Sequence, residues 1–505
     1  MKGFSYPVKI GTLRPNEVGG RNSAQSTICR NTRGHKGGIE GYTPNVKAFP
    51  PIYAVGGVTL LDTTIDWPFP QIFHTDSGLY MGNKTGLYVL EYTGGKWIGT
   101  AITSTVYTHG ITWPWTLANS PLFPVFASGD CFVYYDYDNT YWAVWNKTYD
   151  GETREGSRWS DEWYQPVAAC AFKGQIITCG ATTATTSPSQ SRIVRWTEIG
   201  AFDFLGKTAN ARKNTAGFTY APTDDGEILL RCLPIKNMVI IYGTFSTFAL
   251  VSVDRPVATF EIRPLKGVGI GNPLAVGGNL DKHLMIDRFG YLWMVTYTPG
   301  VVGGGHSEMK RLGYSEYFAD SVGDVSVVYN NMEDEFYIGD GRRSFLYNDF
   351  GLTEIGKCVT SFVDLKNSQI TNQNDVENIY NDPAGFIRPL PEQEFYYSTD
   401  ILDFNLSAIK TIESVEIGGS FGLKTTAEVM VQWRNDKRGS FRDTPWKRCS
   451  PEGFVAPLVS GVEVKVILRL STYVDIELNH ITVRYKVTDK RFIRGMYQNV
   501  SSSDA

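Results

Sequence analysis

The residue types that do chemistry are scattered along this chain of 505 residues rather than gathered in motifs. A zinc site needs histidines or cysteines at short, regular spacings, and no His-x-x-x-His or Cys-x-x-Cys pair occurs. No Ser/His/Asp set can be assembled from the spacing either. The sequence therefore predicts no catalytic residue, no metal ligand, no cofactor-binding residue and no cofactor. The six histidines are His35, His74, His109, His283, His306 and His480.

Two acidic clusters have carboxylates that could ligate calcium, but we interpret both as solvated hairpin tips. Asp136-Tyr-Asp-Asn and Glu333-Asp-Glu both lack the complete Asp-x-Asp-x-Asn-Gly calcium loop. Gly267-Val-Gly-Ile-Gly has the glycine spacing of some phosphate loops, yet its flanks are strand-like and no helix follows. Asp287 stands at an expected strand end before Arg288-Phe-Gly, where a carboxylate usually caps its own turn.

The one notable basic cluster covers residues 434–448. It has six Lys or Arg residues against two Asp, with Phe441 and Trp446 interleaved. This composition could contact DNA or an acidic partner surface. The alternative is a solvated loop between strands, and the sequence alone does not decide between the two.

The seven cysteines are scattered and odd in number, which indicates reduced thiols packed as small apolar groups. They are Cys29, Cys131, Cys170, Cys179, Cys232, Cys358 and Cys449. The N-terminus lacks the apolar run of a signal peptide, and no window approaches 18 apolar residues. We therefore expect assembly in a cytoplasm and no membrane span.

Short apolar runs separated by polar or glycine turns recur along the middle of the chain and are typical of β-hairpins. With 28 Tyr, 27 Phe, 12 Trp and 51 Gly residues, the composition favours strands and tight turns, so the expected class is all-β. Repeats of about 40–50 residues, each supplying a small sheet, predict a β-propeller of about six blades. The repeats begin at residues 79, 132, 176, 238, 284 and 336.

The expected organisation has two folded domains and three less regular segments. Residues 1–50, basic and glycine-rich, are expected to be an extended arm, and residues 51–365 the propeller. Residues 366–395 are polar and are expected to be a linker or long loop. Clean apolar–polar alternation over residues 396–495 predicts a β-sandwich-like domain, and residues 496–505 a flexible tail.

Charge is spread unevenly along the chain, although the total is only −4. Residues 1–47 carry a net +6, residues 48–395 a net −12 and residues 396–505 a net +2. An acidic body does not bind nucleic acid tightly, because tight binding requires that phosphates be neutralised. It remains compatible with a passage through which DNA slides.

Three segments resemble a known family: Met238-Val-Ile-Ile-Tyr-Gly-Thr-Phe-Ser-Thr-Phe-Ala-Leu, residues 269–293, and Val431-Gln-Trp-Arg-Asn-Asp with Asp489-Lys-Arg-Phe-Ile-Arg-Gly. They are similar to the tail nozzle proteins of short-tailed bacteriophages, also called tail tubular or packaged-DNA stabilisation proteins. The resemblance implies a structural virion protein and no enzyme. It implies one subunit of a hexameric tube in the tail that retains packaged DNA and channels it during ejection.

The partners implied by this resemblance are further copies of the chain in a ring, a tail adaptor above, and tail fibre or tip proteins. Double-stranded DNA would pass without sequence-specific binding. The competing hypothesis is a carbohydrate-binding or glycoside-acting propeller, with aromatic residues lining a funnel at one end. Those aromatic residues would be Trp113, Trp115, Tyr134 and Trp142. A third, weaker hypothesis is a scaffold for cellular protein–protein binding.

Overall fold

The computed structural model is almost entirely β, which confirms the expected class. It describes residues 3–15, 21–44, 46–61, 67–102, 113–120, 124–129, 131–136, 141–144, 166–180, 190–200, 215–223, 226–253, 259–299, 305–363, 384–389, 394–422, 425–472 and 476–488. Within these residues the helical elements are one 3-10 turn, η1 (Gln190–Arg192), and one α-helix, α1 (Ser315–Phe318). None of the helices described there is long and apolar enough to cross a membrane.

The chain forms two compact units, which differ from the expected boundaries. The terminal unit contains Met1–Pro44, Arg343–Lys357 and Pro389–Ala505. The central unit contains Asn45–Arg342 and Cys358–Arg388. Most of the linker expected at 366–395, and all of the tail expected at 496–505, lie outside the described residues.

The central unit holds consecutive antiparallel sheets, each built from neighbouring stretches of sequence. The first contains β6 (Ile52–Ala54), β7 (Thr59–Leu61), β8 (Gln71–Thr75), β9 (Gly78–Asn83), β10 (Gly86–Thr93) and β11 (Lys96–Ala101); its one parallel pair is β6–β11. The second contains β12 (Thr116–Asn119), β13 (Pro124–Ala127), β14 (Phe132–Asp136) and β15 (Tyr141–Val144). The third contains β16 (Ala168–Phe172), β17 (Gln175–Cys179), β18 (Ile193–Trp196) and β19 (Gly217–Tyr220).

The later sheets repeat the same up-and-down order. The fourth contains β20 (Leu229–Ile235), β21 (Met238–Gly243), β22 (Thr247–Ser252) and β23 (Phe260–Lys266). The fifth contains β24 (Val276–Gly278), β25 (Lys282–Ile286), β26 (Leu292–Thr298) and β27 (His306–Gly313). A hairpin of β28 (Ser326–Asn330) and β29 (Glu335–Gly339) follows, and β5 (Lys47–Ala48), β32 (Lys357–Val363) and β33 (Ala384–Pro389) form a small sheet.

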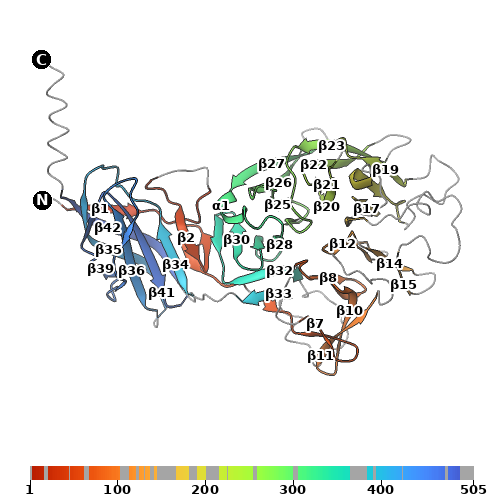
Figure 1. Cartoon of the computed structure of the whole chain (residues 1–505), viewed down its shortest axis with the longest axis horizontal. Coiled ribbons are helices and arrows are strands. Elements are labelled where there is room, and N and C mark those ends of the chain that lie inside the picture. Colours follow the sequence, from red (N-terminus) through yellow and green to blue (C-terminus); the bar gives the residue numbers. More distant parts are fainter. Residues whose placement is uncertain are drawn as a thin grey trace, which may run out of the picture. The chain divides into compact units, whose positions relative to one another are not determined.

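Each sheet of the central unit contacts the next one in sequence, and Figure 1 shows them arranged around a common centre. The last contacts return to the start, because β32 contacts both β28 and β8, an edge strand of the first sheet. The joining contacts are Phe73–Phe126 (ring centroids 5.6 Å), Ala169 N–Thr116 Oγ1 (3.0 Å), Cys232 Sγ–Ile177 O (3.7 Å), Tyr242 Oη–His283 Nδ1 (2.7 Å), Val327 N–Leu274 O (2.8 Å), Ser326 Oγ–Thr360 O (2.9 Å) and Ile72 N–Ser361 Oγ (2.9 Å).

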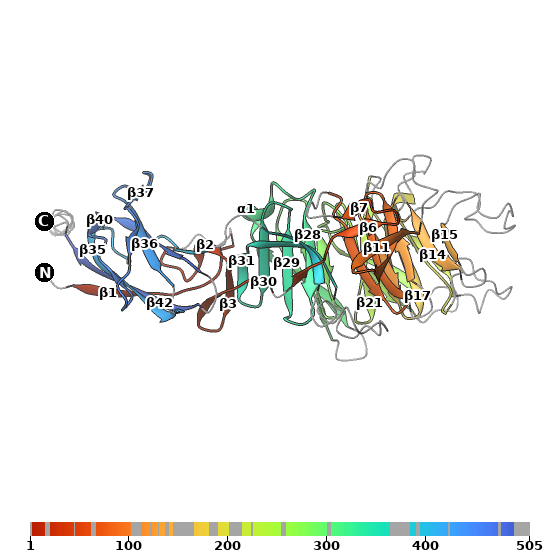
Figure 2. The same ribbon diagram turned by 90° about the horizontal axis from the view of Figure 1, so that it is seen from below.

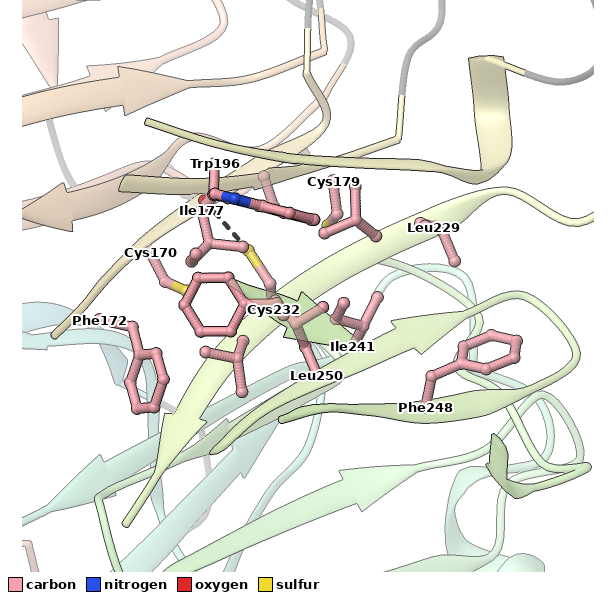
Figure 3. Packing of buried hydrophobic residues seen from close by; sticks show 14 of the residues in the cluster. Cys170, Phe172, Ile177, Cys179, Trp196, Leu229, Cys232, Ile241, Phe248 and Leu250 are labelled. Carbon is pink, nitrogen blue, oxygen red and sulfur yellow. Dashed lines mark hydrogen bonds between the residues drawn. The ribbon is translucent and has the colours of Figure 1, made fainter. Parts of the chain in front are cut away.

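The core between the third and fourth sheets is apolar and contains three thiols (Figure 3). Cys170, Cys179 and Cys232 pack there with Trp196 and Phe248, and every side chain is buried. Burial raises the pKa of the Cys170 and Cys179 thiols, since a thiolate would lack solvation. Cys170 and Cys179 therefore act as small apolar groups, and all seven cysteines are free, as the sequence predicts.

Hairpin turns of the central unit are held by polar side chains that accept backbone N–H groups. Asp287 Oδ1 accepts from the amides of Phe289 (2.8 Å) and Tyr291 (3.0 Å). Its Oδ2 accepts from the indole Nε1 of Trp293 at 2.8 Å. Asn83 has the same role in the first sheet, accepting from Thr85 N at 2.8 Å. The sequence-based interpretation of Asp287 as a turn cap is confirmed.

Replacing Asp287 with alanine should lower the free energy of unfolding by about 2–4 kcal/mol, because three donors lose their acceptor and two of them are backbone amides. Asp287→Asn keeps one acceptor oxygen and should cost about half as much. Urea unfolding of both variants measures this ranking. Equal stability of wild type and Asp287→Ala would contradict the capping role.

The terminal unit is built from both ends of the chain, as the neighbouring labels β1 and β42 show in Figure 2. One sheet has the order β3-β4-β42-β35-β39, with β1 also on β42 and β40 also on β35. Its strands are β1 (Phe4–Val8), β3 (Thr32–His35), β4 (Gly38–Gly41), β35 (Lys410–Ser420), β39 (Phe454–Val455), β40 (Val459–Gly461) and β42 (Glu477–Val487).

The unit's other strands follow the order β30-β31-β2-β34-β41-β36-β37, with β38 also on β36. They are β2 (Ser26–Arg30), β30 (Ser344–Asn348), β31 (Gly351–Glu354), β34 (Phe395–Thr399), β36 (Ala427–Arg434), β37 (Arg442–Asp443), β38 (Lys447–Arg448) and β41 (Glu463–Leu470). Residues 1–50 were expected to be an extended arm. Much of this segment instead lies in strands, because β2 fills the position between β31 and β34 and buries Cys29 completely.

Candidate functional site

The basic segment 434–448 covers the edge of one sheet in the terminal unit, where β36 ends, turns and pairs with β37 and β38. Its first cation does not face solvent. Arg434 donates from Nε to Glu463 Oε2 at 2.6 Å and from Nη1 to Gly439 O at 3.1 Å. Glu463 is fully buried, so the pair is a structural contact. Arg434 is therefore not available to an external phosphate.

The two aromatic rings of this segment are covered by neighbouring cations. The Arg434 guanidinium lies 4.5 Å from the centre of the Phe441 ring, and the Lys465 ammonium lies 5.0 Å from it. Arg469 lies 4.6 Å from the centre of the Trp446 ring. Rings engaged in this way stabilise the edge of the sheet. They are not open platforms on which a base could stack.

Four cations of the segment remain exposed: Lys437, Arg438, Arg442 and Arg448. The turn that carries two of them is fixed, since Asp436 Oδ1 accepts the backbone N–H of Arg438 at 2.9 Å. Exposed cations on a fixed turn can contact phosphate oxygens without reading base sequence. We call these four residues the edge patch. They are the part of the basic segment that remains exposed and able to bind an anion.

Glu463 joins the edge of this sheet to the N-terminal segment. Besides Arg434, it pairs with Arg21, whose Nη2 lies 2.9 Å from Glu463 Oε1. Nearby, the buried Lys410 donates to the carbonyl oxygens of Asp403 (2.8 Å), Leu406 (2.6 Å) and Val462 (2.7 Å). These polar groups hold chain segments together, and their positions are set by the ion pairs and hydrogen bonds between those segments. They do not converge on a substrate position.

A second polar centre lies between the fourth and fifth sheets of the central unit. Tyr242 Oη and His283 Nδ1 are 2.7 Å apart, and His283 Nε2 is 3.1 Å from Pro234 O. Because a carbonyl oxygen only accepts, Nε2 carries the proton and Nδ1 accepts from the tyrosine. Both side chains are buried, so the pair joins sheets and has no access to an external substrate.

Burial lowers the pKa of His283 from 6.5 to about 4, since the imidazolium form would lie away from water. The unfolded chain therefore takes up a proton on this residue first, and stability contributed by the neutral ring is lost as pH falls from 6.5 toward 4. We expect the free energy of unfolding to fall by about 2 kcal/mol more in wild type than in His283→Gln between pH 7 and pH 5. Urea unfolding at both pH values measures the difference; parallel losses in the two proteins would contradict it.

The other clusters singled out in the sequence do not form sites in the described structure. Asp334 pairs with Lys282 at 2.8 Å and accepts from Tyr329, which lowers the pKa of its carboxyl. Asp136 ends β14 and the rest of its cluster lies outside the described residues. No group of three His, Cys, Asp or Glu residues able to hold a metal occurs in the part of the chain that the structure describes.

Two glycine-rich stretches lie against strands. Within residues 267–271, Gly269 lies against the backbone of Gly243, and the stretch leads into the fifth sheet. Residues 418–422 match the Gly-x-Ser-x-Gly motif, which is not among the motifs identified from the sequence above. Ser420 ends strand β35 and no helix follows, so the serine is not on a nucleophile elbow.

The aromatic residues expected to line a funnel under the carbohydrate hypothesis are not grouped as such. Trp115 is buried in a core cluster and its Nε1 donates to Asn83 O at 3.0 Å. Tyr134 packs against a second core cluster, while Trp113 is half-buried and lies against Gly129. The side chain of Trp142 lies outside the described residues. Trp115 is therefore a core residue between two sheets.

No protein-family model matches this chain, and no curated protein sequence matches it. A solved structure described as "Glycoside hydrolase" is 9% identical, with 82% of this chain and 96% of that chain covered, at a TM-score of 0.23. The extracellular domain of the putative one-component system BT4673 from B. thetaiotaomicron is 11% identical, with 76% and 52% covered, at a TM-score of 0.25. Similarities at these TM-scores carry no argument about fold or function.

Proposed function

We propose that this chain is a structural virion protein, one subunit of a ring-shaped tail nozzle that retains packaged DNA and lets it pass during ejection. The observation that carries the proposal is the order of two all-β units. One is a series of sequential small sheets, and the other joins the chain's two ends. That order agrees with what the family resemblance of residues 238–250, 269–293, 431–436 and 489–495 implies.

The central unit is, in this proposal, a propeller of about six blades. Five sequential sheets and the β28–β29 hairpin supply the blades, and the contacts of β32 with Ser326 and Ile72 link the last to the first. Ring closure by such a contact leaves only short, protected strand edges. The terminal unit then serves as the β-sandwich-like platform, with its neighbours in the ring, the tail adaptor and the fibre or tip proteins as partners.

Charge supports passage of DNA rather than retention by tight binding. Residues 48–395 carry a net −12, and a closed ring repeats each charge that faces the passage around its axis. Such a wall repels phosphates and lets the duplex slide. The edge patch is an exposed cationic surface of the terminal unit, and it supplies sequence-independent contacts at most.

We expect the purified full-length protein to bind duplex DNA weakly at about 150 mM salt, with a Kd above about 1 μM. Reversal of the edge patch to glutamate at Lys437, Arg438, Arg442 and Arg448 should weaken binding at least tenfold at low salt and flatten its salt dependence. Fluorescence anisotropy with a labelled duplex measures both quantities. Submicromolar, salt-sensitive binding that persists in the reversed variant would contradict a conduit with an acidic body.

A further inference from the structure

Two adjacent sheets of the central unit present an exposed Phe–Arg–Phe cluster at their hairpin turns. Phe245 lies in the turn between β21 and β22, and Arg288 and Phe289 lie in the turn between β25 and β26. The Arg288 guanidinium lies 4.4 Å from the centre of the Phe245 ring and 5.4 Å from that of Phe289. The two phenylalanines are 47% and 66% exposed. We call these three residues the aromatic tip.

The backbone beneath the aromatic tip is fixed by two buried carboxylates. Glu227 Oε1 accepts the N–H groups of Phe245 (2.8 Å) and Ser246 (3.2 Å), and Asp287 Oδ1 accepts that of Phe289 (2.8 Å). Both carboxylates are nearly fully buried. The rings are therefore presented on two rigid turns, and binding a partner through them would cost little ordering entropy.

Arg288 has ring contacts but no carboxylate partner among the residues that the structure describes. An exposed guanidinium between two exposed rings has the composition of interface hot spots, where Arg and aromatic residues predominate. The partner that fits this chemistry offers one carboxylate flanked by an apolar side chain. The carboxylate would pair with the guanidinium and the apolar group would cover a ring.

This chain offers such a segment at the opposite end of the same strand. Strand β25 begins after the turn Asn279-Leu-Asp281 and ends at Ile286, directly before Asp287 and the aromatic tip. Leu280 is 55% exposed, and the Asp281 side chain is 61% exposed although it pairs with Lys236. An exposed aliphatic side chain beside an exposed carboxylate complements the aromatic tip in both charge and polarity.

We propose that the aromatic tip binds the 279–281 turn of a second copy of this chain, so that central units associate head to tail. Because the two surfaces lie at opposite ends of one strand, each copy can use both at once. A head-to-tail contact of this kind is heterologous, and it produces a closed ring when the rotation between copies closes. The inference rests on the proposed ring-shaped assembly and names the contact that forms it.

Charge reversal in the full-length protein tests this contact, with mass measured by light scattering after size exclusion. Arg288→Glu and Asp281→Lys should each weaken assembly at least tenfold, and the double variant Arg288→Glu/Asp281→Lys should restore it. Arg342→Glu, an exposed cation in the turn that follows β29, is the matched control and should assemble as wild type. Thermal unfolding of each variant shows that it remains folded.

The outcomes distinguish failure of the contact from failure of the proposed nozzle. A wild-type ring that survives Arg288→Glu unchanged overturns the head-to-tail contact and leaves the ring standing. Loss of assembly that the double variant does not restore overturns the assignment of residues 279–281 as the occupant. A wild-type protein that stays monomeric at micromolar concentration overturns both this contact and the proposed nozzle.

Discussion

Removal of residues 1–44 should unfold the terminal unit while the central unit stays folded. Strand β2 lies inside a sheet, between β31 and β34, and β1 and β4 both pair with β42. Without them Cys29 and Ile39, both fully buried, leave holes in the core, and three interior strands, β31, β34 and β42, become edges. This loss exceeds the stability of 5–15 kcal/mol that ordinary domains have.

Hydrogen exchange followed by mass spectrometry can measure this expectation for each unit separately. Amides of β35, β36, β41 and β42 should lose protection in the truncated protein, and those of β20–β26 should keep it. Removal of residues 1–9 alone is the graded control, because it deletes only β1 and should cost much less. Protection of the C-terminal strands that survives the longer truncation would show that residues 1–44 are an arm after all.

Replacing Glu463 with alanine should destabilise the terminal unit by about 3–5 kcal/mol, because Arg434 and Arg21 lose their common carboxylate and Arg434 is largely buried. The chain provides a matched control at the other end of the same β36–β41 ladder. There Glu428 pairs with Arg469, and both side chains are about one-third exposed. Surface pairs of this kind contribute about 0–1 kcal/mol, so Glu428→Ala should have little effect.

Urea unfolding of the two alanine variants, followed by a probe in the terminal unit, gives the comparison. Glu463→Gln keeps the shape and one acceptor, so its loss should be intermediate. Similar unfolding midpoints for Glu463→Ala and Glu428→Ala would mean that burial does not set the strength of these pairs. The ion pairs of Glu463 with Arg21 and Arg434 would then not be what holds the N-terminal segment in place.

Local patterns predicted the strands of the central unit well, because hairpins are set by neighbouring residues. Ile176, Met238, Leu284 and Phe336 all fall in the second strand of a sheet or hairpin, and Leu79 falls in β9, the second strand of the β8–β9–β10 run. Phe132, in contrast, begins the third strand of its sheet, so the second repeat was placed one strand late. Period-2 alternation marks a strand but does not number it within its sheet.

The N-terminal segment was harder to predict, because its partners are more than 300 residues away. Short strands such as β2 and β3, rich in Ser, Thr and Gly, have little periodicity of their own. They are ordered by β34, β31 and β42, and a sequence pattern does not reveal pairing at that distance. The basic character that suggested an arm is explained by ion pairs such as Arg30–Glu354 and Arg21–Glu463.

For the basic segment 434–448, composition alone overestimated how many cations are available to bind a partner. Counting six cations over residues 434–448 gave equal weight to Arg434, which points to Glu463, and to the exposed Arg438. The aromatic tip was missed for the opposite reason, since the sequence places Phe289 in an ordinary turn after Asp287 and Phe245 within an ordinary strand–turn–strand unit. Only the adjacency of two sheets brings them to either side of Arg288.

Native mass spectrometry of the purified full-length protein, with negative-stain electron microscopy of the same sample, tests the central proposal most directly. We expect a single closed species with a mass close to six times the 56.3 kDa of one chain, seen end-on as a ring. A protein that remains at 56.3 kDa at micromolar concentration, or that forms open-ended filaments, would contradict a nozzle subunit.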